Sequence, residues 1–298
     1  MGMTLNFRCW TLDFCLILYL NLNTLIQTTK LRLVFFGEQI LLMLKNKHKF
    51  MKRKTIFGTM MLASTMAIAQ LQPAKMTPES SEIWDPIPRV VTPGTSATAP
   101  SDAVVLFDGK NLDNWVAAKD GKSAPAWTVA DGAMTVSAGK GDVQTKQEFG
   151  NFQLHIEFRT PAVVKGDGQN RGNSGVFMQG LYELQVLDNY ENRTYSNGQA
   201  GSIYKQKMPL VNACKKPGEW QTYDVIYTAP QFNKDGMMLT SPYITVLQNG
   251  ILVQNHTEIR GTTPFIGLPV VAPHGKGPIK LQDHGNPTSY RNIWIREM

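Results

Sequence analysis

Cysteine is nearly absent from this chain of 298 residues, which contains three. Cys9 and Cys15 both precede residue 51, so Cys214 is the only cysteine in the rest of the sequence. A single thiol has no partner for an intrachain disulfide and cannot form a cysteine-based zinc site. The folded part of the chain must therefore be stabilised by its hydrophobic core.

A basic surface is also missing once the first 69 residues are set apart. The chain has a formal net charge of +7, but residues 1–69 hold nine of its 30 Lys and Arg and only two of its 23 Asp and Glu. The remaining sequence has 21 residues of each sign and no basic cluster with interleaved aromatic residues. Because nucleic acid binding requires a basic footprint, the sequence predicts no nucleic-acid partner.

No apolar run is long enough to span a membrane. Residues 51–69 begin with MKRK, continue with an apolar run to Ile68 and end in AIA. This is the three-part pattern of a secretory signal peptide, and the apolar run is shorter than the ~20 residues of a spanning helix. We therefore expect translation to start at Met51 and residues 1–50 to be upstream sequence that is read through. We also expect export to the periplasm or the cell exterior.

Residues 70–102 are rich in Pro, Ser and Thr, which indicates a linker or an extended arm. In residues 103–298, short runs rich in Val, Ile, Phe, Tyr and Thr alternate with turn residues, and no segment keeps a helical apolar period over three turns. This pattern is typical of an all-β domain, with two-residue hairpin turns at Asp131-Gly132 and Asn249-Gly250. The predicted strands are residues 104–107, 127–130, 133–137, 142–145, 152–160, 174–179, 181–188, 221–228, 243–248, 251–256, 279–283 and 290–298.

The stretch 171–188, RGNSGVFMQGLYELQVLD, combines two predicted strands with many polar side chains. Strand side chains alternate between the two faces of a sheet, so Leu184 faces the core while Glu183 and Gln185 face away. Gly175 lies inside the first strand, where a glycine allows a ligand or another strand to approach closely. A solvated outer sheet face shows the same alternation, so both interpretations stay open at this point.

Seven motifs, in order over nearly all of residues 103–298, resemble the 3-keto-disaccharide hydrolase-like family. They are LFDGKNLDNW, FGNFQLHIEFR, NSGVFMQ, YELQVLD, GEWQTYDVI, QNG and IKLQDHGNPTSYRNIWIRE. The resemblance implies a concanavalin A-like antiparallel β-sandwich (jelly roll). It also implies an exported enzyme of carbohydrate breakdown that cleaves glycosides oxidised at C3, with a partner oxidoreductase as the source of the keto sugar.

Polar side chains that alternate away from the core are expected to gather on one face of the sandwich. The candidate catalytic residues are Glu183, His284 and Arg291, and the candidate substrate-binding residues are Glu157, Arg159, Arg171, Asn173, Gln185, Gln282 and Trp220. Ordinary structural roles remain open for several of them: Glu157 with Arg159 as a cross-strand ion pair, and Trp220 as a core residue.

A keto group at C3 makes the C2 proton acidic, so the C1–O bond can break by elimination once a base removes that proton. Glu183 or His284 is expected to act as this base. Arg291, Arg171 or a divalent cation such as Ca²⁺ would hold the enolate oxygen. Carboxylate and imidazole ligands for a cation exist at Glu183, Asp188, Asp283 and His284, but without the spacing of a known metal motif.

Two other functions remain open. Glu183-x-Gln185-x-x-Asp188 keeps the E-x-D-x-x-E spacing of concanavalin A-like glucanases, which would make Glu183 the nucleophile and Asp188 the acid of a retaining glycosidase. Such an enzyme needs its two carboxyl groups about 5 Å apart. The same fold also serves carbohydrate-binding modules without any catalytic activity.

Overall fold

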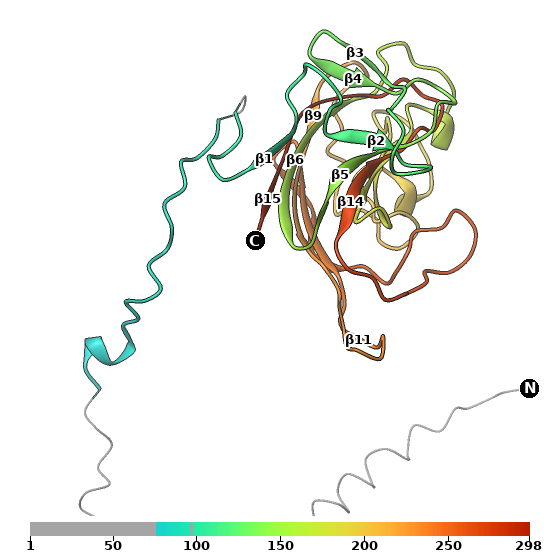
Figure 1. Cartoon of the computed structure of the whole chain (residues 1–298). Helices are drawn as coiled ribbons and strands as arrows, with labels where there is room; N and C mark the ends of the chain where they lie inside the picture. Colours follow the sequence, from blue (N-terminus) through green and yellow to red (C-terminus); the bar gives the residue numbers. More distant parts are fainter. Residues whose placement is uncertain (1–75, 96–97) are drawn as a thin grey trace, which may run out of the picture. The chain divides into compact units, whose positions relative to one another are not determined.

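The computed structural model describes residues 76–95 and 98–298, which form parts of two units, Met1–Ile87 and Pro88–Met298 (Figure 1). The described residues of the first unit are exposed and contain one 3-10 turn, Pro78–Ser81. The expected signal peptide and the residues before it lie outside the described residues. No helix in the described ranges is long and apolar enough to cross a membrane. The domain boundaries expected from the sequence stay predictions.

The second unit consists of two antiparallel β-sheets around one core, and the described residues contain no α-helix (Figure 1). The large sheet has the strand order β13 (Ile251–Glu258), β12 (Tyr243–Gln248), β9 (Gln221–Thr228), β6 (Phe152–Arg159), β15 (Ser289–Glu297), β4 (Ala133–Thr135) and β3 (Thr128–Ala130), and β1 (Val104–Phe107) also pairs with β15. The small sheet has the order β2 (Trp115–Ala117), β5 (Val143–Phe149), β14 (Gly277–Leu281), β7 (Ser174–Met178) and β8 (Tyr182–Val186). Strands β10 (Gln231–Phe232) and β11 (Met238–Thr240) form a separate hairpin. The predicted concanavalin A-like β-sandwich is confirmed.

The core lies between the inner faces of the two sheets. Leu154 and Ile156 of β6 and Leu184 of β8 are fully buried, as their alternation in the sequence predicts. Burying a side chain of this size stabilises the fold by about 1.5–3 kcal/mol. Tyr223 of β9 donates a hydrogen bond of 2.7 Å from its hydroxyl to the main-chain oxygen of Gln185. The large sheet thereby holds strand β8 in place across the core.

Two hairpins turn where the sequence predicts. Asp131 and Gly132 join β3 to β4 with φ angles of 52° and 74°, and Asn249 and Gly250 join β12 to β13 with φ angles of 53° and 80°. Positive φ at both central positions is the geometry of a type I′ turn, whose twist matches that of the flanking strands. The hairpin signals therefore fix the register of two strand pairs.

All twelve predicted strands coincide with observed strands, with ends that differ by a few residues. The prediction missed β2, β10 and β11, which are two or three residues long. A run of that length is too short to show an alternation of period two.

Strand β8 lies at one edge of the small sheet, and the chain segment after it covers that edge. The main-chain N–H of Gln185 donates to the oxygen of Ser202 at 3.0 Å, and that of Tyr204 donates to the oxygen of Glu183 at 3.2 Å. The exposed backbone of an edge strand is thus paired, as buried polar groups require. The outward side chains of β8 consequently face a walled space instead of open solvent.

Candidate active site

Glu183 lies on the outer face of the small sheet but is almost fully buried. Tyr182 and Leu184 beside it point into the core, so alternation turns Glu183 outward. Its exposed fraction is only 4%, and its carboxyl group has no hydrogen bond or ion pair within the described part of the chain. Burying a carboxyl group without a hydrogen bond or an ion pair costs free energy, so this burial destabilises the fold.

Gly175 makes the space that this carboxyl group occupies. In the register of β7 and β8, Gly175 pairs with Gln185 and Phe177 pairs with Glu183. A Cβ atom at position 175 would lie 2.6 Å from Oε1 of Glu183 and 2.9 Å from Cε2 of Phe177. Any side chain here would displace the carboxyl group of Glu183. The glycine therefore allows this carboxyl group to lie close to the backbone of β7, and the sequence predicts such a close approach at Gly175.

A cavity of about 130 Å³ opens beside Glu183. Strands β7 and β8 form its floor, and the segments after β8, β13 and β14 form its walls. Its lining residues are Asn173, Phe177, Glu183, Gln185, Tyr204, Thr263, Phe265, Gln282 and His284. The structure therefore brings together five of the predicted site residues: Asn173, Glu183, Gln185, Gln282 and His284.

Burial is the main influence on the charge of Glu183. It raises the pKa of this carboxyl group from 4.5 to about 8. The positive charge of Lys280 acts in the opposite direction, and the negative charge of Asp142 adds to the increase. The ammonium group of Lys280 lies 4.0 Å from the centre of the Phe177 ring and 3.7 Å from a carboxylate oxygen of Asp142. Glu183 thus holds a proton at neutral pH and can release it to a substrate.

Two amide groups in the cavity have unused hydrogen-bonding capacity. The side-chain oxygens of Gln185 and Gln282 are buried and have no partner in the described residues. The side-chain nitrogen of Gln185 donates to Oε1 of Gln169 at 3.2 Å and to Oδ1 of Asn173 at 3.3 Å, which fixes the orientation of the amide. Unpaired buried acceptors are rare in folded proteins and fit a ligand with hydroxyl groups.

His284 lies at the open side of the cavity, on the segment that follows β14. The residue is exposed, and its ring has no hydrogen-bond partner among residues that the structure describes. Glu183 and His284 line the same cavity, as the sequence predicts. The cavity thus brings together an exposed imidazole and a buried carboxyl group.

Four predicted site residues lie elsewhere, on the outer face of the large sheet. Arg291 of β15 pairs with Glu157 of β6 in the strand register, and Nε of Arg291 contacts Oε2 of Glu157 at 2.6 Å. The guanidinium carbons of Arg291 and Arg159 lie 4.2 Å and 4.6 Å from the centre of the Trp220 ring. The prediction that these residues share one face with Glu183 is wrong because β6 and β15 belong to the other sheet.

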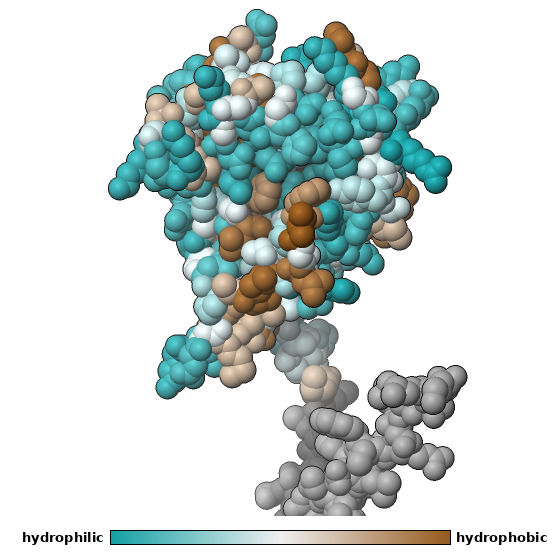
Figure 2. Space-filling model, turned by 90° about the vertical axis from the view of Figure 1, so that its right-hand side faces the viewer, coloured by the Kyte–Doolittle hydropathy of each residue, from teal (hydrophilic) through white to brown (hydrophobic). Residues whose placement is uncertain are grey.

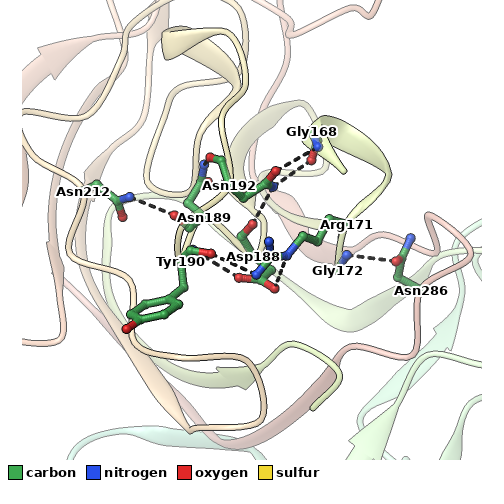
Figure 3. Close-up of polar contacts among 9 residues, drawn as sticks. All are labelled: Gly168, Arg171, Gly172, Asp188, Asn189, Tyr190, Asn192, Asn212 and Asn286. Atoms are coloured by element: carbon green, nitrogen blue, oxygen red, sulfur yellow. Dashed lines mark hydrogen bonds and ion pairs between the residues drawn. The ribbon is translucent and has the colours of Figure 1, made fainter. Parts of the chain in front are cut away.

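Arg171 and the buried Asp188 form an ion pair that organises a loop (Figure 3). Nε of Arg171 contacts Oδ2 of Asp188 at 2.7 Å, and the main-chain N–H of Tyr190 donates to Oδ1 at 3.1 Å. Asn192 donates to the main-chain oxygen of Asp188 at 2.7 Å and also bonds to Gly168 (Figure 3). Both groups of the ion pair are therefore engaged in holding the backbone.

The ion pair borders a second cavity of about 750 Å³, lined also by Arg159, Thr160 and Asn286. This cavity shares no lining residue with the one beside Glu183. Asp188 therefore does not line the cavity of Glu183, contrary to the arrangement that a glucanase-type pair of carboxyl groups requires.

The four candidate metal ligands do not converge. Asp188 is engaged by Arg171, and the carboxylate of Asp283 accepts hydrogen bonds from the main-chain N–H groups of Gly141 and Gly285, both at 2.9 Å. Among residues 76–95 and 98–298, no three His, Cys, Asp or Glu side chains are close enough to hold a metal ion.

Several cavity residues escaped the sequence analysis. Tyr204, Thr263 and Phe265 lie in irregular segments, where no period marks a direction. The position of Phe177 in the cavity could have been predicted, because alternation along β7 turns this apolar side chain away from the core.

Comparison with known proteins identifies the family. Residues 102–296 match the family model of the 3-keto-alpha-glucoside-1,2-lyase-like domain. A crystal structure from Parabacteroides distasonis ATCC 8503, of a protein provisionally named a glycosyl hydrolase, is 57% identical over 76% of this chain and 99% of that chain, with a TM-score of 0.73. Another protein from that organism with the same provisional name is 27% identical over 66% of this chain and 99% of that chain, with a TM-score of 0.44. No curated protein matches the chain. The resemblance found in the sequence is thus confirmed, and the chain belongs to the 3-keto-alpha-glucoside-1,2-lyase-like domain family.

Proposed function

We propose that this protein cleaves the glycosidic bond of 3-keto-glycosides by elimination, using Glu183 and His284. Family membership and the relative named as a glycosyl hydrolase support a carbohydrate-active, hydrolase-like function. The 3-keto substrate is the finer part of the proposal. The observation that carries it is the buried, proton-holding Glu183 at a cavity with His284 on its open side.

The chemistry requires a base, an acid and a group that holds an enolate. The base removes the proton from C2, and the electron pair forms an enolate with the C3 carbonyl. The C1–O bond then breaks, the leaving oxygen takes a proton from the acid, and a C1–C2 double bond remains. Addition of water across this bond releases the 3-keto sugar, so the net reaction is hydrolysis.

The cavity offers a residue for each role. His284 is the base, because imidazole exchanges protons readily near neutral pH and this ring is exposed and unpaired in the described structure. Glu183 is the acid, because burial keeps its proton in place. The amide of Gln282 has no side-chain hydrogen bond within the described residues and can donate to the enolate oxygen. This assignment replaces Arg171 and Arg291, which lie outside the cavity.

The retaining-glycosidase alternative finds less support. Its acid would be Asp188, which is bound to Arg171 and lines a different cavity. A binding module without catalysis would have no use for a carboxyl group whose burial raises its pKa by several units, since hydroxyl recognition works better with an ionised carboxylate or an amide.

Turnover of a 3-keto-α-glucoside and of the same glucoside without the keto group tests the proposal. We expect cleavage of the keto form only. Glu183→Gln and His284→Ala should each reduce turnover by ~10²-fold or more, the usual contribution of acid–base catalysis. The matched controls are Glu219→Gln and His256→Ala, because both residues are exposed and distant from the cavity lining. Cleavage of the unoxidised glucoside would favour the glucanase alternative, and binding without cleavage of either would favour the module.

We also propose that the protein is exported, on the basis of the signal-peptide pattern of residues 51–69. Mass spectrometry of the protein from cell fractions tests this. A peptide from before Met51, or an uncleaved protein in the cytoplasm, would contradict it.

A further inference from the structure

The segment between β13 and β14 exposes a group of large apolar side chains. Phe265, Ile266 and Leu268 are 70%, 83% and 83% exposed. Figure 2 shows apolar side chains gathered on the face of the molecule that carries this segment, at the right of Figure 1. A cluster of apolar side chains on a surface is costly in solubility and often marks a binding site.

The apolar segment is anchored by backbone contacts at its base and at Phe265. The N–H of Thr262 donates to the oxygen of Val270 at 3.0 Å, which closes the base of the loop. The side chain of Gln206 donates to the oxygen of Gly261 at 2.9 Å, and Nζ of Lys205 contacts the oxygen of Phe265 at 2.5 Å. These contacts restrict the loop backbone, which reduces the conformational entropy that is lost when a ligand binds.

Phe265 connects this surface to the catalytic cavity. It lines the cavity beside Glu183 and is also largely exposed, so it belongs to both. The cavity volume of about 130 Å³ is well below the ~300–1,000 Å³ of pockets that enclose a whole drug-sized ligand. The cavity can therefore enclose the reacting part of a glycoside, while the remainder of the molecule must lie outside it.

We infer that the exposed side chains of Phe265, Ile266 and Leu268 form the binding surface for the leaving group, and that the preferred substrates are glycosides of apolar alcohols. This inference rests on the proposed function. A sugar as leaving group would present hydroxyl groups to these apolar side chains, which offer it no hydrogen bonds. An aromatic or aliphatic alcohol would instead bury apolar surface against them.

The larger cavity beside Arg171 is a less suitable place for the leaving group. It shares no lining residue with the cavity of Glu183, and its lining includes Arg159, Lys165 and the Arg171–Asp188 ion pair. The apolar surface, in contrast, meets the catalytic cavity at Phe265.

The test compares 3-keto-α-glucosides that differ only in their leaving group: methyl, 2-phenylethyl, and glucosyl in a disaccharide. Methyl and 2-phenylethyl leave as simple aliphatic alcohols of similar acidity, so a difference in kcat/KM reports binding of the phenyl ring. We expect wild-type protein to prefer 2-phenylethyl over methyl by ~10-fold or more, the usual size of discrimination by apolar contacts. The double variant Ile266→Ser/Leu268→Ser, at two residues outside the cavity lining, should reduce this preference to near unity and leave kcat/KM for the methyl glucoside almost unchanged.

Ile226→Ser is the matched control, because Ile226 is a half-exposed apolar residue of β9 in the other sheet. It should keep the wild-type preference. Equal kcat/KM for the methyl and 2-phenylethyl glucosides, a preference for the disaccharide, or a preference that survives in the double variant would overturn the inference while the proposed function stands. Absence of turnover with every 3-keto-glucoside would overturn the proposed function and this inference together.

Discussion

Replacing Glu183 with Gln should make the protein more stable, by an amount that grows with pH. The amide has nearly the same shape as the carboxyl group but cannot ionise. In the folded protein burial raises the pKa of Glu183 from 4.5 to about 8, so the wild-type protein must keep a proton that the unfolded chain has already released at neutral pH. The folded state then binds more protons than the unfolded state, and stability falls as pH rises.

The size of the effect follows from the two pKa values. Below about pH 4.5 the carboxyl group is protonated in both states, so wild type and variant should have nearly equal free energies of unfolding. Between pH 4.5 and 8 the wild-type protein loses about 1.4 kcal/mol for each pH unit, and above pH 8 the loss is complete. The variant should therefore gain ~3 kcal/mol over wild type between pH 5 and pH 8, as an order of magnitude.

Urea unfolding of wild type and Glu183→Gln at pH 5, 6.5 and 8 measures this difference, with Glu219→Gln as a control that makes the same substitution at an exposed position. A stability difference that is independent of pH, or a variant less stable than wild type at pH 8, would refute the reasoning. The same pKa predicts that kcat for a 3-keto-glycoside falls as pH rises through about 8. The residual activity of Glu183→Gln should lack this decline.

Three further variants test other parts of the structure. Gly175→Ala should reduce kcat by about 10-fold or more with little loss of stability, because its Cβ would lie 2.6 Å from Oε1 of Glu183 and displace the carboxyl group; steady-state kinetics beside thermal melting shows this. Arg171→Met should destabilise the fold by about 3–5 kcal/mol in urea unfolding, because it leaves the carboxylate of Asp188 buried and uncompensated. Cys214→Ser should change the melting temperature by a few degrees at most and leave turnover intact. Burial raises the pKa of the Cys214 thiol, so alkylation of the native protein should be slow at neutral pH.

The floor of the candidate site could be predicted from the sequence because it depends on local alternation. Leu184 is apolar and Glu183 and Gln185 are polar, which fixes the direction of each side chain once the strand is recognised. Gly175 marked the position at which the neighbouring strand leaves room for the carboxyl group of Glu183. His284 and Gln282 follow a strand whose alternation was equally clear.

The sheet to which a strand belongs could not be predicted in the same way. Alternation shows which side chains of β6 point away from the core, but an outward position looks the same in either sheet. Glu157 and Arg291 were therefore grouped with Glu183, although the core separates the two outer faces. The sheet to which each strand belongs is determined by strand pairing, of β6 with β15 and of β7 with β8. The walls of the cavity come from irregular segments, whose side-chain directions depend on tertiary contacts.

The burial of Glu183 excludes one of the two interpretations that the sequence left open, a solvated sheet face. On a solvated sheet face this carboxyl group would be exposed and ionised, and the side chain missing at Gly175 on the neighbouring strand would have no effect on it. Instead the chain pairs the edge of β8 with residues 202–204, places Thr263 and Phe265 over the outer face, and keeps position 175 without a side chain. The covering segments remove water from Glu183, and Gly175 leaves room for its carboxyl group, but none of them supplies a partner for that group. The burial of Glu183 therefore reduces stability at neutral pH. Features that reduce stability in concert are expected where a reaction needs them, because proteins accept strained or desolvated groups mainly at functional sites.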